Sequence, residues 1–158
     1  MGACILSVAK SRGLNVIAVS EKNADRRGVA LSLGARSALD PAELASLPPV
    51  PVVVDAVGRA ETRETALKRV AKGGTVLLLG LDEGATTLDF QDVVRREVRL
   101  QGSFAYNDLH FKEALDFVVE RRADFRSWTE TMPLEQGQDG FERLINAPGD
   151  RLKIALIP

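Results

Sequence analysis

Residues 1–21, MGACILSVAKSRGLNVIAVSE, decide the fold of this chain. Apolar residues at helical spacing follow Gly2, and Gly13 stands where a left-handed cap ends such a helix. The apolar run NVIAVS predicts a strand buried on both faces, and Glu21 follows it. Nineteen positions separate Gly2 from Glu21, close to the ~20 between a phosphate-binding glycine and a ribose-binding carboxylate. The stretch therefore predicts the back half of a dinucleotide-binding unit.

The unexpected feature of this stretch is that it does not contain the front half of that unit. One strand and two earlier glycines normally precede the glycine that opens the helix, whereas only Met1 precedes Gly2 here. We therefore expect a sheet that lacks its first strand. On this reading the chain is a fragment, a gene model begun at an internal methionine, or a decayed gene.

The rest of the chain alternates helical and strand patterns, which predicts a doubly wound α/β fold with a parallel sheet. Helices are expected over residues 23–33, 61–70 and 90–96, with a brief one after Asp40-Pro41 and a stop at Gly73-Gly74. Strands are expected over residues 37–39, 51–58, 75–81 and 98–105, the one at 51–58 buried.

The alternation loosens after Tyr106. The remaining pattern predicts a long amphipathic helix over residues 107–121, a strand over 128–134, a helix over 139–146 and a strand over 153–157. We therefore expect two parts, a nucleotide-binding domain over residues 1–106 and a small α+β segment over residues 107–158.

Composition narrows the class of protein. The 158 residues carry a net charge of -1, which argues against nucleic-acid and anionic-membrane partners. No apolar run approaches the ~20 residues of a membrane span. The single cysteine, Cys4, rules out an internal disulfide, and we expect a cytoplasmic protein. With one cysteine and one histidine, His110, the chain cannot build a tetrahedral Cys/His metal site from its own residues.

Five stretches together resemble a known family: VVVDAVG (52–58), GGTVLLLGL (73–81), VRLQGSFAY (98–106), HFKEALDFV (110–118) and PLEQGQDGFERL (133–144). Their sequence and order are similar to the cofactor-binding half and C-terminal tail of the medium-chain, zinc-dependent alcohol and polyol dehydrogenases. The resemblance implies a Rossmann-type sheet of order 3-2-1-4-5-6 in which the first, central strand is missing.

The resemblance also implies which residues hold the cofactor. Gly2 and Ala3 would face the pyrophosphate at a helix N-terminus. Glu21 would bind the adenosine ribose and disfavour a 2′-phosphate, which favours NAD over NADP, with Lys22 and Arg26 close by. The remaining positions would line the ribose and nicotinamide: Val57, Gly58, Leu79, Gly80, Leu81, Ser103 and Phe104.

The activity implied by the resemblance is hydride transfer between an alcohol or polyol and NAD. Zinc and the proton relay would belong to an N-terminal domain upstream of Met1. We therefore assign no catalytic or metal-binding residue within this chain, and we expect the chain alone to be inactive. In such enzymes the sixth strand pairs across a two-fold axis, so the resemblance also implies a homodimer through Val98 to Phe104.

Three alternatives remain open at this stage. The first is a zinc-free NADPH-dependent reductase of the same superfamily, which Glu21 disfavours. The second is an S-adenosylmethionine methyltransferase, which the QGSFAY stretch and the C-terminal tail disfavour. The third is a non-catalytic nucleotide-binding or dimerisation module. Each site residue also has a structural interpretation: Gly2 as an unstrained helix start, Glu21 as a solvated acid, and Gly58 and Gly80 as turn residues only.

Overall fold

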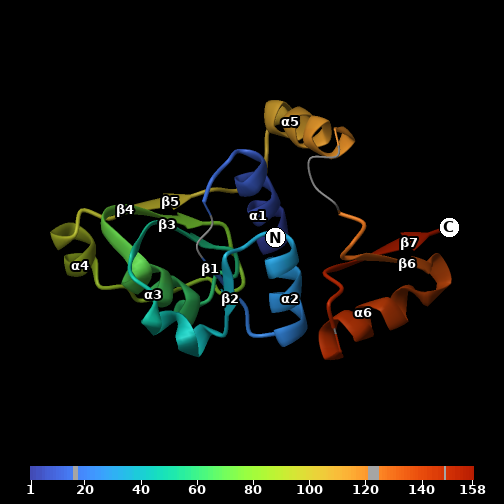
Figure 1. Ribbon diagram of the computed structural model, residues 1–158, viewed down its shortest axis with the longest axis horizontal. Helices are drawn as coiled ribbons and strands as arrows, with labels where there is room; N and C mark the ends of the chain where they lie inside the picture. Colours follow the sequence, from blue (N-terminus) through green and yellow to red (C-terminus); the bar gives the residue numbers. More distant parts are fainter. Residues whose placement is uncertain (16–17, 121–124, 148) are drawn as a thin grey trace. The chain divides into compact units, whose positions relative to one another are not determined.

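The computed structural model describes residues 1–15, 18–120, 125–147 and 149–158 (Figure 1). These residues form two compact units. The first contains Met1–Leu44 and His110–Pro158, and the second contains Ala45–Leu109. No helix among the described residues is long and apolar enough to cross a membrane.

The N-terminal part of the first unit contains two helices and two short strands. Asn23 begins the second helix because its side chain accepts a hydrogen bond from the backbone N–H of Arg26. The two strands pair in parallel, and a small core of Leu6, Ala30 and Ala35 packs the helices against them. The elements are α1 (Gly2–Ser11), β1 (Ala18–Ser20), α2 (Ala24–Ser32), β2 (Ser37–Leu39) and the 3-10 helix η1 (Pro41–Ser46).

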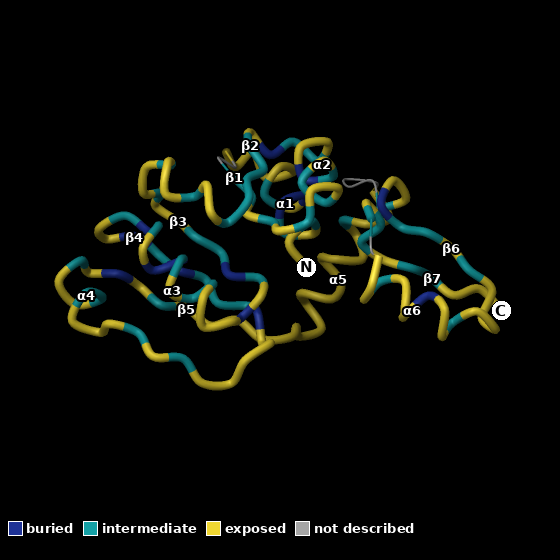
Figure 2. The backbone as a smooth tube through the Cα atoms, turned by 90° about the horizontal axis from the view of Figure 1, so that it is seen from below, coloured by how far each residue is buried: buried dark blue, intermediate teal, exposed yellow. Residues whose placement is uncertain are grey.

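The second unit is built on three parallel strands in the order β3-β4-β5. Helix α3 contacts β3 and β4, and the buried residues Leu67, Val70 and Val76 belong to the core of this unit. Figure 2 colours the backbone by burial, with buried residues dark blue. The bounds are β3 (Val50–Asp55), α3 (Ala60–Arg69), β4 (Val70–Leu78), α4 (Phe90–Arg95) and β5 (Arg99–Gly102).

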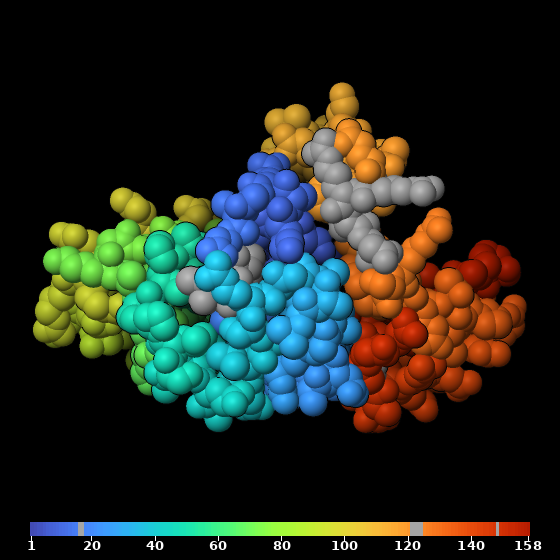
Figure 3. Space-filling model, viewed as in Figure 1, coloured from blue at the N-terminus to red at the C-terminus, as the bar shows by residue number. Residues whose placement is uncertain are grey.

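The C-terminal part of the first unit begins with α5 (Asp108–Val119). It continues with β6 (Thr129–Pro133), η2 (Leu134–Gln136), α6 (Gly137–Asn146) and β7 (Lys153–Ile157), which gather together in Figure 3, orange to red. Strands β6 and β7 pair in parallel. Helix α6 packs on these strands at Gly140, where an added Cβ would make ordinary contacts of 3.4 Å with Met132 and 3.7 Å with Ile154.

The order of strands within each ladder agrees with the predicted doubly wound sheet. Ladder β2-β1 corresponds to one half of that order, and ladder β3-β4-β5 to the other. Every pairing is parallel, and among the described residues no ladder joins β1 to β3. The prediction of a parallel α/β fold is confirmed.

Two details of the sequence prediction were wrong. The strand at 51–58 is not buried throughout: Val52 is 58% exposed, because strand side chains point to the faces of the sheet and the described residues leave this one uncovered. Gly73 and Gly74 do not precede β4 but lie within it, where the register between β3 and β4 shifts. The strand expected at residues 15–20 and the helix expected to end at 121 both extend onto residues outside those described.

Candidate functional site

The turn that follows β3 is held by the side chain of Asp55. This residue is only 4% exposed, and its Oδ1 accepts hydrogen bonds from the backbone N–H groups of Val57 and Gly58, both at 3.0 Å. Gly58 has a φ of +86°, a conformation that costs little only for glycine. The turn is therefore fixed at the carboxyl end of the strand.

The turn that follows β4 touches the first turn through backbone alone. The N–H groups of Leu79 and Gly80 both donate to the main-chain oxygen of Asp55, at 2.9 and 3.0 Å. A Cβ added to Gly58 would lie 2.1 Å from the carbonyl carbon of Gly80, and one added to Gly80 would lie 2.0 Å from the carbonyl carbon of Val57. Both glycines are therefore required by the close approach of two backbones. This is a stronger constraint than that on residues that only form a turn.

The residues after Gly80 are tied to the start of α3. The N–H of Glu83 donates to the carbonyl of Gly58 at 2.9 Å, and the Glu83 carboxylate accepts from the N–H of Ala60 at 2.7 Å. Arg59 forms an ion pair with Asp82, and this hydrogen bond raises the pKa of Arg59 above its usual value. These contacts hold the loop that carries Leu79, Gly80 and Leu81.

Exposed apolar side chains follow the carboxyl ends of all three strands of the second unit. Val57 after β3 is 49% exposed, Leu81 after β4 is 73% exposed, and Phe104 after β5 is 81% exposed. Ser103 joins this edge because its N–H donates to the carbonyl of Leu78 at 3.0 Å. Ligands of open α/β sheets bind outside the carboxyl ends of the strands, so this edge is the candidate nicotinamide-side site.

The acidic residue after β1 is part of a small network in the first unit. One carboxylate oxygen of Glu21 accepts from the N–H of Asn23 at 2.8 Å. Arg27 donates to the carbonyls of Glu21 and Lys22, at 2.8 and 2.9 Å, and forms an ion pair with Asp40 at 3.5 Å. The segment that carries Glu21 and Lys22 is therefore anchored at the carboxyl end of β1.

Gly2 and Ala3 form the first turn of α1. Met1, the N-cap residue, makes no side-chain cap, and the first turn contains no acidic residue. The helix therefore offers backbone N–H groups that no side chain of the helix caps, as an anion site needs. A Cβ added to Gly2 would meet nothing within 4 Å, so here the glycine is not imposed by neighbouring atoms.

The twelve predicted residues divide between the two units. The adenosine-side and pyrophosphate-side residues lie in the first unit, with Glu21, Lys22 and Arg26 close together in the chain around the start of α2. The nicotinamide-side residues lie in the second unit, where hydrogen bonds join the turns after β3 and β4. Sequence reasoning missed the residues that hold these segments, namely Asp55, Arg59, Asp82, Glu83 and Arg27. Only the place of Asp55 at the end of an apolar strand could have indicated such a role.

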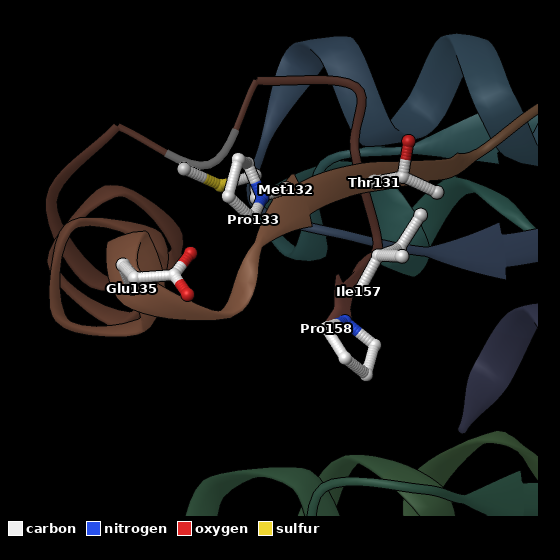
Figure 4. Close-up of a pocket in the computed structure, with 6 residues that line it drawn as sticks. All are labelled: Thr131, Met132, Pro133, Glu135, Ile157 and Pro158. Carbon is white, nitrogen blue, oxygen red and sulfur yellow. The ribbon is translucent and has the colours of Figure 1, made fainter.

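Neither a metal site nor the described cavity coincides with these residues. Among the residues that the structure describes, no three His, Cys, Asp or Glu side chains are grouped so that they could hold a metal ion. An open cavity of about 280 Å³ lies where β6 and β7 end (Figure 4). Its lining includes none of the twelve predicted residues: Thr131, Met132, Pro133, Glu135, Ile157 and Pro158.

Comparison with known proteins gives consistent results. Residues 1–120 match the sequence profile of a family described as zinc-binding dehydrogenase. An alcohol dehydrogenase of Geobacillus stearothermophilus is 30% identical over 154 residues, covering 91% of this chain and 44% of that protein. A sorbitol dehydrogenase of Macaca fascicularis is 27% identical over 168 residues, covering 99% and 46%. The chain therefore spans less than half the length of these relatives.

Solved structures show the same fold. An alcohol dehydrogenase of Thermus sp. ATN1 superposes with a TM-score of 0.89 at 23% identity, covering 99% of this chain and 48% of that one. Acetophenone reductase of Geotrichum candidum, solved with NAD, gives 0.85 at 26% identity and covers 97% and 45%. A zinc-binding dehydrogenase of Sinorhizobium meliloti, solved with NADP, gives 0.85 at 24% identity and covers 99% and 49%. The Rossmann-type prediction is confirmed.

Proposed function

The chain belongs to the zinc-binding dehydrogenase family, and from this premise we propose that it is the NAD-binding part of an oxidoreductase that transfers hydride between an alcohol or polyol and NAD. The carboxyl edge of β3-β4-β5 carries the proposal. There two turns approach so closely that neither Gly58 nor Gly80 admits a side chain, and exposed apolar residues border them. The match over residues 1–120 argues against the methyltransferase alternative.

Each unit, taken by itself, offers residues that suit one part of a dinucleotide. Val57, Leu81 and Phe104 offer exposed apolar surface for the nicotinamide ring. We assign backbone groups of Ser103 and Phe104 to its carboxamide from the family resemblance, with the Ser103 N–H already donating to the carbonyl of Leu78. The N–H groups of the first turn of α1 suit a pyrophosphate, and the Glu21 carboxylate suits ribose hydroxyls. When bound, the nicotinamide supplies the hydride acceptor. In this proposal the chain binds and orients the cofactor.

We propose no zinc ligand within this chain, and among the described residues no three His, Cys, Asp or Glu side chains are grouped as metal ligands. We assign zinc, the proton relay and most of the substrate pocket to the part of the relatives that these 158 residues do not cover. Accordingly, we expect weak cofactor binding and no turnover from the 158 residues alone. An alcohol or polyol is the substrate class because the relatives are named alcohol, sorbitol and altritol dehydrogenases.

Glu21 supports NAD over NADP in this proposal. A ribose 2′-phosphate beside its carboxylate would suffer like-charge repulsion, whereas the free 2′-hydroxyl could donate a hydrogen bond to it. The test is calorimetric titration of the wild-type chain and E21S with both cofactors. We expect the wild-type chain to bind NAD more tightly than NADP. In E21S the ratio of NAD affinity to NADP affinity should fall about tenfold, which corresponds to ~1.4 kcal/mol.

The matched control is E43S, which removes another carboxylate of the first unit whose oxygen accepts from the N–H of Asp40 at 2.9 Å. It should leave the cofactor preference unchanged. A wild-type preference for NADP would favour the zinc-free reductase alternative. An equal loss of preference in E21S and E43S would remove Glu21 from the proposal.

We also propose a cytoplasmic homodimer that pairs through the stretch Val98 to Phe104. Strand β5 lies at the edge of its sheet and pairs with β4 alone among the described residues. Phe104 is largely exposed just beyond it. Edge strands with unpaired N–H and C=O groups are ready to pair with a second chain. If dimerisation occurs without cofactor binding, the chain is the non-catalytic dimerisation module.

A further inference from the structure

Asp55 is a buried acid that receives hydrogen bonds from both turns of the candidate site. Its Oδ1 accepts the N–H groups of Val57 and Gly58, and its main-chain oxygen accepts those of Leu79 and Gly80. We infer that Asp55 is the positioning residue that fixes the turn 56–58 against the turn 79–81, so that both present a fixed surface to the nicotinamide half of the cofactor. The cofactor part of this inference rests on the proposed function.

Four donors converge on this one residue from two strands. The main-chain pair is independent of the side chain, but the pair to Oδ1 needs an acceptor on the side chain itself. Hydrogen bonds to a charged acceptor are stronger than neutral ones. The position of the turn 56–58 therefore depends on the residue type at 55. The Val57 side chain is exposed and does not anchor the turn.

The second carboxylate oxygen adds an observation that packing alone does not explain. Oδ2 is buried and has no hydrogen-bond partner among the described residues. A buried polar atom without a partner is costly, so a residue chosen only to fill this space would be apolar. An acid at this position is accounted for by the two donors that Oδ1 holds in place.

The test is amide hydrogen exchange of the ligand-free chain, which does not require cofactor binding. In D55A we expect the amides of Val57 and Gly58 to exchange about tenfold or more faster than in wild type, with the Val76 amide as the internal reference. This factor corresponds to the loss of one hydrogen bond to a charged acceptor. D55N keeps an oxygen acceptor and should restore part of the protection. D55L keeps a similar volume but has no acceptor. A merely space-filling role would leave exchange in D55L close to that of wild type, whereas the inference expects D55L to lose protection as D55A does.

The matched control is D89A in the same unit, which removes the Oδ1 that accepts the N–H of Asp92 at 3.1 Å at the start of α4. It should speed exchange at Asp92 and not at Val57 or Gly58. If D55A fails to fold, D55N against D89N carries the test, with a severalfold loss expected at Val57 and Gly58. Exchange at these amides no faster in the Asp55 variants than in the Asp89 variants overturns the inference.

NAD titration of the same variants separates this inference from the proposed function. If both hold, wild type binds NAD, and affinity falls about tenfold or more in D55A, less in D55N and not in D89A. If wild type binds no NAD but the exchange pattern is as expected, the proposed function fails while the positioning of the turn by Asp55 stands. If D55A binds NAD as tightly as wild type, Asp55 does not position the turns for the cofactor.

Discussion

Replacing Gly58 with alanine should be far more damaging than replacing Gly73, although both lie in the second unit and have positive φ angles of +86° and +72°. At Gly58 the new Cβ would lie 2.1 Å from the carbonyl carbon of Gly80, 2.2 Å from its oxygen and 2.5 Å from the nitrogen of Leu81. These are backbone atoms and cannot rotate away. At Gly73 the new Cβ would meet nothing within 4 Å.

The magnitude follows from two separate costs. A non-glycine residue held at positive φ costs about 1 to 3 kcal/mol, and both variants carry this strain. Forcing an extra carbon into a packed site costs a further ~1 to 3 kcal/mol, which only G58A carries. We therefore expect the free energy of unfolding to fall by about 2 to 6 kcal/mol in G58A and by the strain alone in G73A. Since domains are stable by only ~5 to 15 kcal/mol, G58A should be conspicuously weak.

The assay is urea denaturation of the full chain followed by circular dichroism, with NAD titration of each variant that folds. G58A should unfold at a clearly lower urea concentration than G73A and should bind NAD more weakly, because the turn at Gly80 must move. G73A should keep the NAD affinity of wild type. Equal unfolding midpoints for the two variants would refute the close approach of the two turns and the reasoning built on it.

Two further predictions concern electrostatics and assembly. The hydrogen bond from Arg96 lowers the pKa of Asp92 below its usual value. The contribution of this ion pair to stability is therefore present above the unfolded pKa and is lost as pH falls through the lower folded pKa. Urea midpoints should therefore fall as the pH drops below about 4, the unfolded pKa of an aspartate. The fall should be less steep in D92N, and an unchanged slope in D92N would contradict this. F104D should weaken self-association, measured by light scattering, about tenfold or more, which corresponds to a loss of ~1.4 kcal/mol. The control is F90D, because Phe90 is another exposed phenylalanine of the same unit, and it should leave self-association unchanged. Equal effects of the two variants would exclude the β5 edge as the interface.

The parallel α/β architecture was predictable because its signals are local. Asn23 caps α2 through a hydrogen bond to a residue three positions away, and apolar runs such as VVV before Asp55 indicate strands without any knowledge of neighbours. Burial was less predictable, because it depends on what lies beside a strand. Val52 is an apolar, β-branched residue of the kind that fills buried strands, yet the described residues leave it 58% exposed.

The candidate site was predictable where it consists of glycines and strand ends. Gly58 and Gly80 are 22 positions apart, and nothing in the sequence shows that their backbones touch. The residues that hold the turns in place escaped prediction for the same reason: Asp82 and Glu83 meet Arg59 and Ala60 across 23 positions. Exposed charged residues of this kind look like ordinary surface in the sequence, and only the fold brings them together.

NMR titration of the isotope-labelled 158-residue chain with NAD tests the central claim most directly. The account predicts saturable shift changes at the amides of Gly58, Leu79 to Leu81 and Ser103, together with changes at Gly2, Ala3 and Glu21. Titration with inorganic phosphate should shift only the amides at the start of α1. Absence of saturable changes with NAD, or changes confined to the cavity between Thr131 and Pro158, would contradict the account.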